Sequence, residues 1–564
     1  MDIFKKHIIS LLKKSVTLNE KDIIAILEVP PNPSFGDYSL PCFLMAKDLK
    51  KNPNEIAFNL TKLFSKDKYI EKVECKGAYV NFFINKSKFN SMILKEILKL
   101  KEKYGFNKTK KEKIVIEYPS PNTNKPLHLG HVRNMLIGQS VSNILKFNNQ
   151  NVIQVNLNND RGVHICKSML AYKKYGNNKK PNKKNDHFVG DYYVLYSENA
   201  KQHPELELEI QDMLLKWEKN NPEVLKLWKL MNSWAIKGFN ETYKLFNIKF
   251  DKIYNESDHY KRGKSIVLNA YRKKLFEKDE NDNICVNLEK YNLPNKILLR
   301  KDGTSVYITQ DIGLAKVKYD DFKMNKSVYV VGSEQNLHFK QLFKILDMLK
   351  FKNVKGLIHL SYGMIYLPEG KMKSREGTVV DADDLVEKIK NLALEEVKKR
   401  YKLSKDEAEK RAFEIGMAGL RYLILKYDAA KDFVFNPNET ISFEGDTGPY
   451  IQYTYARASS ILRKTKFDKK VDFSLLKESK ENELIKILSN FPRVVNKASR
   501  DFKPNYIANY SYELAQKFNE FYHSCPVIHE DEELKNARCS LVLAFTHVIK
   551  TSLSLLGINV LEEM

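Results

Sequence analysis

An alternation of strand-like and helix-like segments early in the chain limits the folds that this sequence can adopt. The segment IVIEY (114–118) has the pattern of a buried strand, and a helical pattern follows it at 129–145. A second strand is expected at 151–157 and a second helix at 162–175. Because strands that alternate with helices form a parallel sheet covered by helices, we expect a doubly wound, Rossmann-like α/β domain.

The remainder of the chain divides into parts with different patterns. With 564 residues the chain is too long for one hydrophobic core, and three or four domains are expected. A small α+β domain is expected before the lysine-rich linker at 104–113. Strand-like segments return later, and after residue 384 only helical periodicity remains, which predicts an all-α C-terminal bundle. The later strands are predicted at 305–309, 327–332 and 356–362, and the divisions at 1–110, 111–383 with a helical insert at about 177–262, 384–440 and 441–564.

The chain is strongly basic, with a formal net charge of +25. A surplus of this size favours a polyanionic partner, and nucleic acid is the usual one. The alternative is compositional, since the chain is rich in Lys, Asn and Ile in the way that AT-rich coding produces. Charge alone leaves both interpretations open.

Cysteine usage and hydropathy indicate a protein of the reducing cytoplasm. The six cysteines are scattered and none forms a C-x-x-C pair, so we expect neither a structural zinc nor a disulfide framework. No apolar run approaches the roughly 20 residues that span a bilayer. Lys13 and Lys14 interrupt the short apolar patch at the start before it could serve as a signal-peptide core.

A pair of histidines around a glycine lies between the first strand and its helix. His128 and His131 are three residues apart and flank Gly130 in the segment PSPNTNKPLHLGHVRN (119–134). A glycine lets the backbone approach a nucleotide, and a helix N-terminus presents free N–H groups to phosphate. The histidines could donate hydrogen bonds to phosphate oxygens whose charge grows during a displacement. By itself the pattern is weak, because paired histidines at a helix start are more often structural or metal ligands.

A second cationic segment follows the last predicted strand. Residues 370–377 read GKMKSREG, in which Lys371, Lys373 and Arg375 lie between two glycines. These cations could neutralise a pyrophosphate leaving group. The alternative interpretation is a solvated basic turn.

Together these two segments resemble the signatures of class I aminoacyl-tRNA synthetases. His128-Leu129-Gly130-His131 has the form of the HIGH motif on the first βα turn, and residues 370–377 resemble the KMSKS loop. One position departs from the pattern, because Ser374 stands where the motif has its second lysine. In arginine-specific members that lack this lysine, a lysine just before the HIGH motif is thought to replace it, and Lys125 occupies that place. Whether Lys125 or Lys373 supplies the charge stays open.

The resemblance is more specific to the arginyl-tRNA synthetase family and covers nearly the whole chain. It is carried by EYPSPN (117–122), DRG (160–162), YITQD (307–311), GDTGPYIQY (445–453) and the ending at 556–564. The resemblance implies a catalytic set of His128, Gly130, His131, Lys125, Lys371, Lys373, Ser374 and Arg375. It implies an ATP site, used with Mg²⁺, at Pro121, Asn122, Leu129, Gly130 and Met372.

A pocket for arginine should hold carboxylates and oriented acceptors, because the guanidinium and α-ammonium groups are donors only. The resemblance implies that Glu117 and Asn122 bind the α-ammonium. It implies that Glu256, Tyr307 and Asp311 line the guanidinium site and that Gln335 bridges near the substrate; the match around Glu256 is short. The residues themselves leave alternatives, a helix N-cap for Asp311 and a core aromatic for Tyr307.

Two regions carry the expected contacts with tRNA(Arg). FGDYS (35–39) and KGAYVN (76–81) resemble the family's N-terminal domain, which contacts the D-loop corner, and Tyr79 could stack on a base that Asn81 reads. Tyr79 could equally be a core residue of a strand. Tyr450, Tyr453 and Arg457 share one helix face in the region that resembles the anticodon-binding bundle, although bundle packing would explain them too. The expected RNA-binding set is Lys76, Tyr79, Asn81, Tyr450, Tyr453, Arg457 and Met564.

The expected activity is the ligation of L-arginine to tRNA(Arg) through arginyl-adenylate, with transfer to the 2′-hydroxyl of the terminal adenosine. The enzyme is expected to act as a monomer without a resident metal and without a covalent intermediate. A nucleotidyltransferase that needs no RNA is the nearest rival, against which the basic helical C-terminal half argues. A catalytically inactive RNA-binding paralogue is another, against which the intact His128, Gly130, His131, Asn122 and Asp311 argue.

Overall fold

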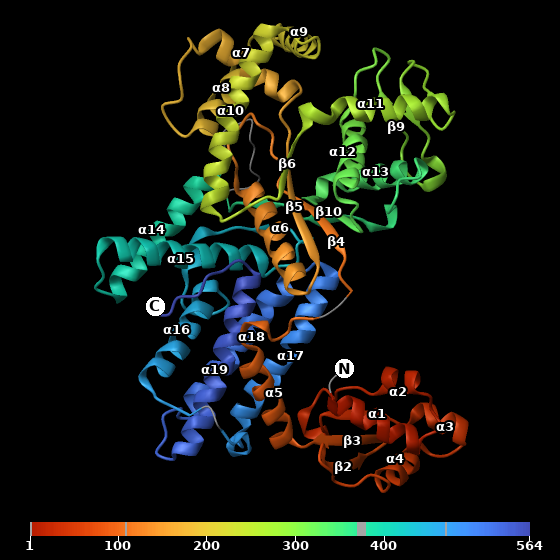
Figure 1. Ribbon diagram of the computed structural model, residues 1–564, viewed down its shortest axis with the longest axis vertical. Helices are drawn as coiled ribbons and strands as arrows, with labels where there is room; N and C mark the ends of the chain where they lie inside the picture. Colours follow the sequence, from red (N-terminus) through yellow and green to blue (C-terminus); the bar gives the residue numbers. More distant parts are fainter. Residues whose placement is uncertain (1–2, 108–109, 369–379, 469–470) are drawn as a thin grey trace. The chain divides into compact units, whose positions relative to one another are not determined.

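The computed structural model describes residues 3–107, 110–368, 380–468 and 471–564 (Figure 1). The chain forms two compact units. One unit comprises residues 1–104, 457–490 and 514–549, and the other comprises residues 105–456, 491–513 and 550–564.

The N-terminal part of the first unit is a small α+β fold. Its elements are α1 (Ile3–Ser15), α2 (Glu20–Ile26), β1 (Tyr38–Pro41), α3 (Phe43–Leu49), α4 (Pro53–Thr61), β2 (Ile70–Lys76), β3 (Tyr79–Ile84) and α5 (Lys86–Leu100). The three strands form an antiparallel sheet of order β1-β3-β2. Val80 and Phe82 of the central strand are fully buried and pack with Leu12 of α1 and Leu40 of β1. The α+β class expected for this region is confirmed.

An all-parallel sheet of five strands forms the centre of the second unit. In spatial order the strands are β11 (Leu357–Tyr362), β10 (Lys326–Gly332), β4 (Lys113–Glu117), β5 (Asn151–Asn158) and β6 (Lys252–Asn255). The accompanying helices are α6 (Leu129–Phe147), α7 (Val163–Tyr175), α12 (Tyr307–Phe322) and α13 (Asn336–Met348). Of the strands in this sheet, β4 comes first in the chain. It pairs with β5 on one side and β10 on the other, so the strand order reverses beside it. Ligands of such sheets bind beyond the carboxyl ends of the strands at this reversal.

Two details of the sheet domain differ from the sequence prediction. Residues 305–309 are not a strand, because α12 begins at Tyr307. Their β-branched and aromatic composition favoured a strand, but Ile308 and Ile312 are one helical turn apart and both lie in a buried core cluster. The strand β6 lies within the range predicted for the helical insert, which therefore ends with α10 (Pro222–Leu245).

The insert and the segment after it form two smaller structures. The insert consists of α8 (Asn185–Asn199), α9 (Leu206–Glu218) and α10, and it is followed by α11 (Glu256–Arg272) and an antiparallel sheet of β7 (Glu277–Lys278), β8 (Ile284–Val286) and β9 (Lys296–Leu299). Gly238 of α10 allows a close approach to α8, since a Cβ there would lie 2.2 Å from Oδ1 of Asp186.

The helix that follows the histidine motif is fastened to distant chain by one buried arginine. Nη1 of Arg133 in α6 donates to the carbonyls of Gly363 (2.8 Å) and Met364 (3.2 Å), and Nη2 donates to those of Ala429 (2.9 Å) and Lys431 (2.7 Å). These carbonyls flank β12 (Ile365–Tyr366) and β13 (Phe433–Val434), which pair in parallel. The start of α6 therefore has a fixed position relative to both segments.

The region after residue 380 is helical, as predicted. It contains α14 (Ala382–Arg400), α15 (Lys405–Leu425), α16 (Gly448–Lys464), α17 (Ser479–Asp501), α18 (Asn505–Ser524) and α19 (Glu532–Leu555). Short 3-10 helices lie at Pro33–Phe35, Lys101–Lys103, Glu289–Tyr291, Ser333–Gln335, Val354–Gly356, Pro437–Ile441 and Phe473–Leu475. Among the described residues, no helix is both long and apolar enough to cross a bilayer.

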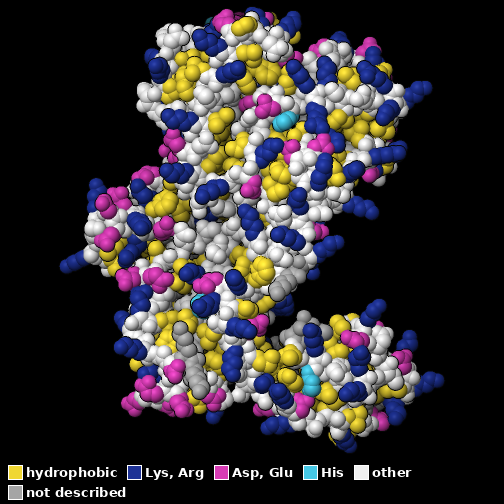
Figure 2. Space-filling model, viewed as in Figure 1, with side chains coloured by type: hydrophobic (Ala, Val, Ile, Leu, Met, Phe, Trp, Pro, Cys, Tyr) yellow, Lys and Arg dark blue, Asp and Glu magenta, His cyan; other side chains and the backbone are white. Residues whose placement is uncertain are grey.

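The basic charge is spread over the visible surface. Figure 2 shows lysine and arginine side chains over all parts of the face in view, interspersed with acidic ones. The net charge of +25 is therefore not concentrated in one stripe on that face, and charge by itself does not locate a nucleic-acid site.

Candidate active site

The two histidines of the glycine motif are held by main-chain amides at the start of α6. His128 is the N-cap residue, and its Nδ1 accepts a hydrogen bond from the N–H of Gly130 (3.1 Å). Nδ1 of His131 accepts from the N–H of His128 (3.2 Å), and the ring centroids are 3.9 Å apart. Because both Nδ1 atoms are acceptors, a neutral ring carries its proton on Nε2. The backbone thus presents two Nε2–H donors.

The environment keeps these rings neutral. Burial, followed by the nearby charge of Lys125, lowers the pKa of His128 to about 3. Burial lowers the pKa of His131 well below its usual value, with His128 and Lys125 as further causes. Neutral donors beside a lysine ammonium suit the oxygens of a phosphate whose charge increases in the transition state. The effect on both rings also indicates that Lys125 lies close to the pair.

The second cationic segment lies outside the described residues, but the chain that follows it is bound to the histidine motif. The N–H of Leu129 donates to the carbonyl of Val380 (3.0 Å), and the N–H of Ala382 donates to that of Leu127 (3.0 Å). Residues 380–382 are therefore fixed beside the start of α6. The residues concerned are Lys371, Met372, Lys373, Ser374 and Arg375, whose roles stay predictions.

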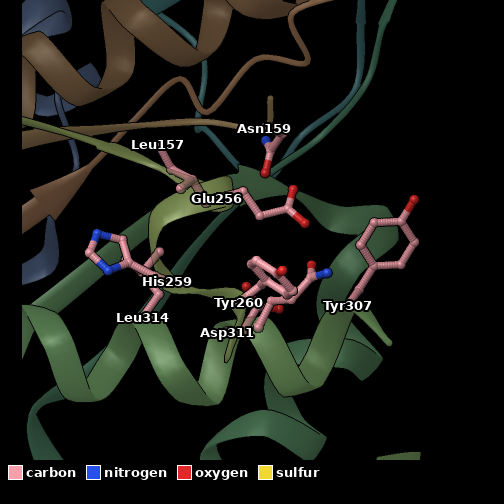
Figure 3. Close-up of a pocket in the computed structure, with 9 residues that line it drawn as sticks. Leu157, Asn159, Glu256, His259, Tyr260, Tyr307, Asp311 and Leu314 are labelled. Carbon is pink, nitrogen blue, oxygen red and sulfur yellow. The ribbon is translucent and has the colours of Figure 1, made fainter. Parts of the chain in front are cut away.

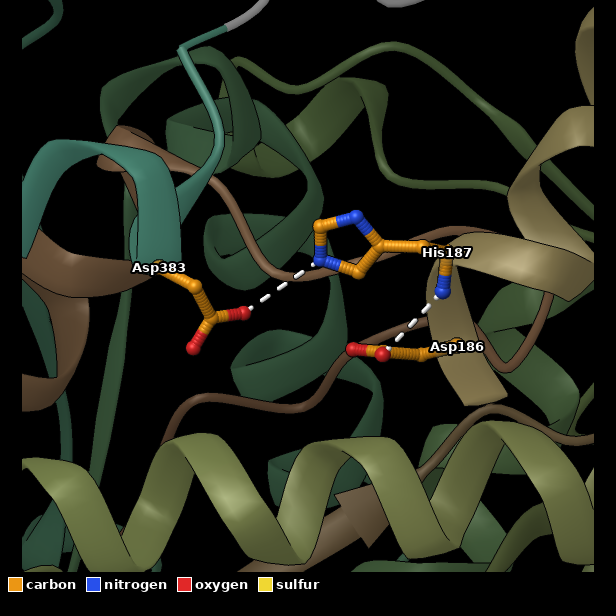
Figure 4. Close-up of side chains that lie close together, drawn as sticks. All are labelled: Asp186, His187 and Asp383. Carbon is orange, nitrogen blue, oxygen red and sulfur yellow. Dashed lines mark hydrogen bonds and ion pairs between the residues drawn. The ribbon is translucent and has the colours of Figure 1, made fainter. Parts of the chain in front are cut away.

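An ion cluster joins the insert to the first turn of α14 close to this point (Figure 4). Asp186 and His187 of α8 and Asp383 of α14 could place ligand atoms around a metal ion. However, Nζ of Lys184 lies 3.1 Å from Asp186 and 2.5 Å from Asp383, so an ammonium already neutralises the carboxylates. Hydrogen bonds that His187 donates to Asp381 and Asp383 raise its pKa to about 10. The cluster acts as a structural ion-pair network.

A small cavity of about 40 Å³ lies near the carboxyl ends of β5 and β6 (Figure 3). Tyr307 and Asp311 are one turn apart on α12, and Figure 3 shows Glu256 of α11 opposite them across the same space. The N-cap of α12 is Val306, so the N-cap alternative for Asp311 is wrong. Tyr307 is 69% exposed, so it is no core aromatic. The lining residues are Leu157, Asn159, Glu256, His259, Tyr260, Tyr307, Gln310, Asp311 and Leu314.

The two carboxylates of the cavity have different partners. Burial raises the pKa of Glu256 to about 8, although the charge of Arg161 opposes this effect. Asp311 is 33% exposed, and its Oδ2 lies 2.7 Å from Nε2 of His338. Sequence reasoning missed Arg161 and His338 as neighbours because both contacts join residues far apart in the chain.

The residues predicted to hold the α-ammonium group lie in different surroundings. Glu117 is 6% exposed at the end of β4, and its Oε2 accepts from Nζ of the fully buried Lys318 (2.7 Å). Asn122 is exposed and forms a backbone bridge with Asn159, which lines the cavity. Gln335 is exposed in a 3-10 turn after β10. Their contacts with arginine stay predictions, and Glu117 has in addition a structural ion pair that the sequence did not reveal.

The N-terminal candidates for RNA contact divide into surface and buried residues. Lys76 is exposed, with Nζ 3.6 Å from the ring centroid of Phe35. Tyr79 is half-buried against Phe43, with ring centroids 5.6 Å apart. Asn81 is only 3% exposed, and its Oδ1 accepts from Oγ of Ser39 (2.6 Å). The structure contradicts a base-reading role for Asn81, because its amide holds the sheet together.

The C-terminal candidates lie on one face of α16, as predicted, but each also has packing partners. Tyr450 lies against Tyr512 with centroids 5.7 Å apart, and Tyr453 lies against Phe443 at 6.5 Å. Arg457 donates from Nη1 to Oδ1 of Asn519 (2.9 Å). Contact of the three residues with RNA stays a prediction beside this packing role, as it does for Met564, which is 8% exposed.

Comparison with known proteins accounts for almost every part of the chain. Residues 93–437 match a family model described as tRNA synthetases class I (R), catalytic domain. Residues 451–564 match a model of the DALR anticodon binding domain, and residues 2–84 match one of the arginyl tRNA synthetase N terminal domain.

Complete relatives and solved structures agree with the family models. The chain is 44% identical to the arginine–tRNA ligase of Borrelia turicatae, with 98% of this chain and 96% of the relative aligned. It is 44% identical to that of Treponema denticola, with 95% and 94% aligned. The structure of Thermus thermophilus arginyl-tRNA synthetase has the same fold, with a TM-score of 0.78, 24% identity and 99% of each chain covered. The Plasmodium falciparum arginyl-tRNA synthetase gives a TM-score of 0.80 at 20% identity over 100% of both chains. With relatives this similar over nearly its whole length, the chain belongs to the arginyl-tRNA synthetase family of the class I aminoacyl-tRNA synthetases.

Proposed function

We propose that this chain is an arginine–tRNA ligase that activates L-arginine with ATP and then esterifies the 2′-hydroxyl of the terminal adenosine of tRNA(Arg). The observation that carries the proposal is a cavity with two carboxylates, Glu256 and Asp311, in the domain whose first βα turn presents the two Nε2–H donors. A guanidinium requires acceptors only, and a triphosphate requires donors only.

The first step forms arginyl-adenylate and releases pyrophosphate. The α-carboxylate of arginine attacks the α-phosphorus, and the bond to the bridging oxygen of the leaving pyrophosphate breaks. His128 and His131 donate to phosphate oxygens, and the ammonium of Lys125 adds positive charge beside them. Mg²⁺ enters with ATP as the metal of that substrate, where it neutralises phosphate charge, and we assign no protein ligand to it.

Selection of arginine would rest on the carboxylates of the cavity. Asp311 would accept the guanidinium from α12, and Glu256 would accept it from α11, with the exposed ring of Tyr307 at the opening. Asn122 and the other carboxylate oxygen of Glu117, Oε1, would hold the α-ammonium group, and Gln335 would contact the same end. An uncharged analogue would bring no cation to these carboxylates, which is the stronger form of discrimination.

The tRNA would be held at three places. Lys76 and Tyr79 of the N-terminal fold are proposed to contact the D-loop corner, and Tyr450, Tyr453 and Arg457 the anticodon. The terminal adenosine would reach the adenylate at the end of β4. The proposal includes a cytoplasmic enzyme that acts as a monomer, and sedimentation at assay concentration tests the oligomeric state.

Arginine-dependent exchange between ATP and pyrophosphate, measured with and without tRNA(Arg), tests the proposal. Exchange with arginine and aminoacylation of tRNA(Arg) are the expected results. If aminoacylation is absent and a carboxylic acid other than arginine supports the exchange, the protein is the RNA-independent nucleotidyltransferase. Binding of tRNA with no exchange under either condition would indicate the inactive paralogue.

A further inference from the structure

The loop after β5 places a buried arginine between the insert and the cavity. The side chain of Arg161 is only 5% exposed. Its Nη2 donates to Oε1 of Glu218 at the end of α9 (2.7 Å), and its Nη1 lies 3.8 Å from Oε1 of Glu256, which lines the cavity. One guanidinium therefore lies between a carboxylate of the insert and a carboxylate of the proposed arginine site.

Two aromatic rings fix the orientation of this guanidinium. Its central carbon lies 4.2 Å from the ring centroid of Tyr260 on α11 and 5.2 Å from that of Trp217 on α9. The two rings also contact each other, with centroids 5.7 Å apart. A lysine ammonium in place of this planar group would lose the contacts with both rings, because it has no flat face to lie over them.

The backbone of the loop is fixed to α11 as well. The carboxylate of Asp160 accepts from the N–H (2.9 Å) and from Oγ (2.7 Å) of Ser257, the residue that follows Glu256. The carbonyl of Asp160 accepts from Nε1 of Trp228 in the insert helix α10 (2.6 Å). The position of Arg161 relative to the first turn of α11 is therefore set by bonds on both sides.

The charges around Glu256 come from the loop and from α12. Arg161 lowers the pKa of Glu256, whereas Asp160 and Asp311 raise it, and burial is the largest cause of its value of about 8. Among the charged residues that shift the pKa of Glu256, Arg161 is the cation. Counted from the insert inward, the charges alternate: Glu218, Arg161, Glu256, and then the guanidinium of a bound arginine.

We infer that Arg161 is a positioning residue for arginine recognition, whose charge favours the ionised form of Glu256 and whose contacts join the helical insert to the first turn of α11, so that the insert is coupled to amino-acid selection. The inference rests on the role proposed above for Glu256. Arg161 itself does not line the cavity, so it acts through Glu256 and not on the substrate.

The test is a comparison of Arg161→Gln and Arg161→Lys in pyrophosphate exchange with saturating tRNA(Arg). Loss of the charge in Arg161→Gln should raise the pKa of Glu256. At a pH below that pKa, each unit of increase in the pKa lowers the ionised fraction of Glu256 about tenfold. We expect KM for arginine at pH 7 to rise about tenfold or more, with kcat and KM for ATP within threefold of wild type. The acid limb of kcat/KM for arginine should move to higher pH, so that alkaline pH partly restores the variant. The titration of the substrate arginine is the same for every variant, so it does not change the comparison of their pH profiles.

Arg161→Lys keeps the charge and should leave the acid limb near its wild-type position while KM rises less. Glu223→Gln is the matched control, because it removes from α10 of the insert an exposed carboxylate that pairs with Lys173 of α7, and it should change nothing. A folded Arg161→Gln protein, verified by its melting curve, with unchanged KM and pH profile overturns the inference. Equal changes in Arg161→Gln and Arg161→Lys also overturn it, because charge would then be irrelevant.

Glu256→Gln separates this inference from the proposed function. If Glu256→Gln raises KM for arginine and Arg161→Gln does not, only the coupling is wrong. If Glu256→Gln leaves KM for arginine unchanged, the proposed pocket is wrong. In the double variant we expect much less than the sum of the two single effects, because both substitutions remove the same charged carboxylate.

Discussion

Main-chain N–H groups occupy the Nδ1 atoms of both His128 and His131, so the pair can offer only its Nε2–H groups to a phosphate. The spacing of the two histidines predicted a phosphate-binding turn, and the structure places both at the N-terminus of α6. The tautomer was not predictable, because it depends on which ring nitrogen meets a main-chain N–H. Likewise, the resemblance implied an RNA contact for Asn81, yet its amide is bound inside a sheet by Ser39, which lies far away in the sequence.

The pair His131→Asn and His131→Gln tests the donor role. The side-chain oxygen of Asn can replace Nδ1 as acceptor for the N–H of His128, but Asn has no donor at the position of Nε2. We expect His131→Asn to lower the rate of adenylate formation by about 10²-fold with an unchanged KM for arginine. His131→Gln, whose amide reaches the position of Nε2, should retain more activity. Single-turnover kinetics measures both, and wild-type rates in His131→Asn would make His131 a structural residue.

The charge of Asp311 is expected to decide between arginine and citrulline. Asp311→Asn replaces an acceptor oxygen by a donor amide that faces a donor-rich guanidinium. We expect kcat/KM for arginine to fall by about 10²–10³, or about 2–4 kcal/mol, and citrulline to lose far less. Pyrophosphate exchange with both substrates gives the ratio. Since Asp311 also meets His338, a melting curve accompanies the assay, and an unaltered ratio would remove Asp311 from the specificity pocket.

At the scale of elements, periodicity predicted where helices lie better than it predicted which elements pack against them. The helices after residue 380 and the first βαβα unit are where their apolar spacing placed them. The strand expected at 305–309 is a helix, because burial of Ile308 and Ile312 outweighs the local β-propensity. The cavity was only partly predictable, since Glu256, Asp311 and Arg161 lie on three elements that the tertiary fold brings together.

Substitutions can decide which residue supplies the positive charge that the second lysine of the KMSKS motif would carry. If Lys125 supplies the charge, Lys125→Ala should abolish most arginine activation, since its charge already acts on both histidines. Lys373→Ala should then have a much smaller effect, and Ser374→Lys should partly rescue Lys125→Ala. Pyrophosphate exchange measures all three. Equal losses at 125 and 373 without rescue would show that the loop carries its own charge.

The cluster at the start of α14 should make stability depend on pH. The pKa of His187 is raised from 6.5 to about 10 by its carboxylate neighbours. A raised pKa means that the stabilisation is complete below pH 6.5 and is lost as the pH rises toward 10. Urea denaturation of wild type and His187→Gln should therefore differ most at pH 6.5 and progressively less at pH 8 and 9.5. A difference that stays constant over this range would show that His187 is not charged in the folded protein.

At the scale of the whole molecule, tRNA recognition should be separable from arginine recognition. Lys76 and Tyr79 lie in the N-terminal fold, whereas the cavity lined by Glu256 and Asp311 lies in the sheet domain. We expect Lys76→Ala and Tyr79→Ala to raise KM for tRNA several-fold and to leave KM for arginine unchanged, because stacking is worth roughly 1–3 kcal/mol per base. Steady-state aminoacylation measures both constants. Asn81→Ala should instead lower the melting temperature, and unchanged tRNA kinetics in Tyr79→Ala would favour its packing role.

The attachment of Arg133 to four carbonyl groups has a consequence for mutational tolerance. Every amino acid carries a main-chain carbonyl, so Met364, Ala429 and Lys431 can change identity without removing an acceptor. Gly363 is different, because a Cβ there would lie 2.5 Å from the main-chain carbonyl carbon of Lys431. No other side chain carries five donors in a planar fork, so position 133 has no substitute. These four bonds of α6 thus depend on the identity of Arg133 and Gly363, whereas the other three carbonyl groups are independent of the side chains of their residues.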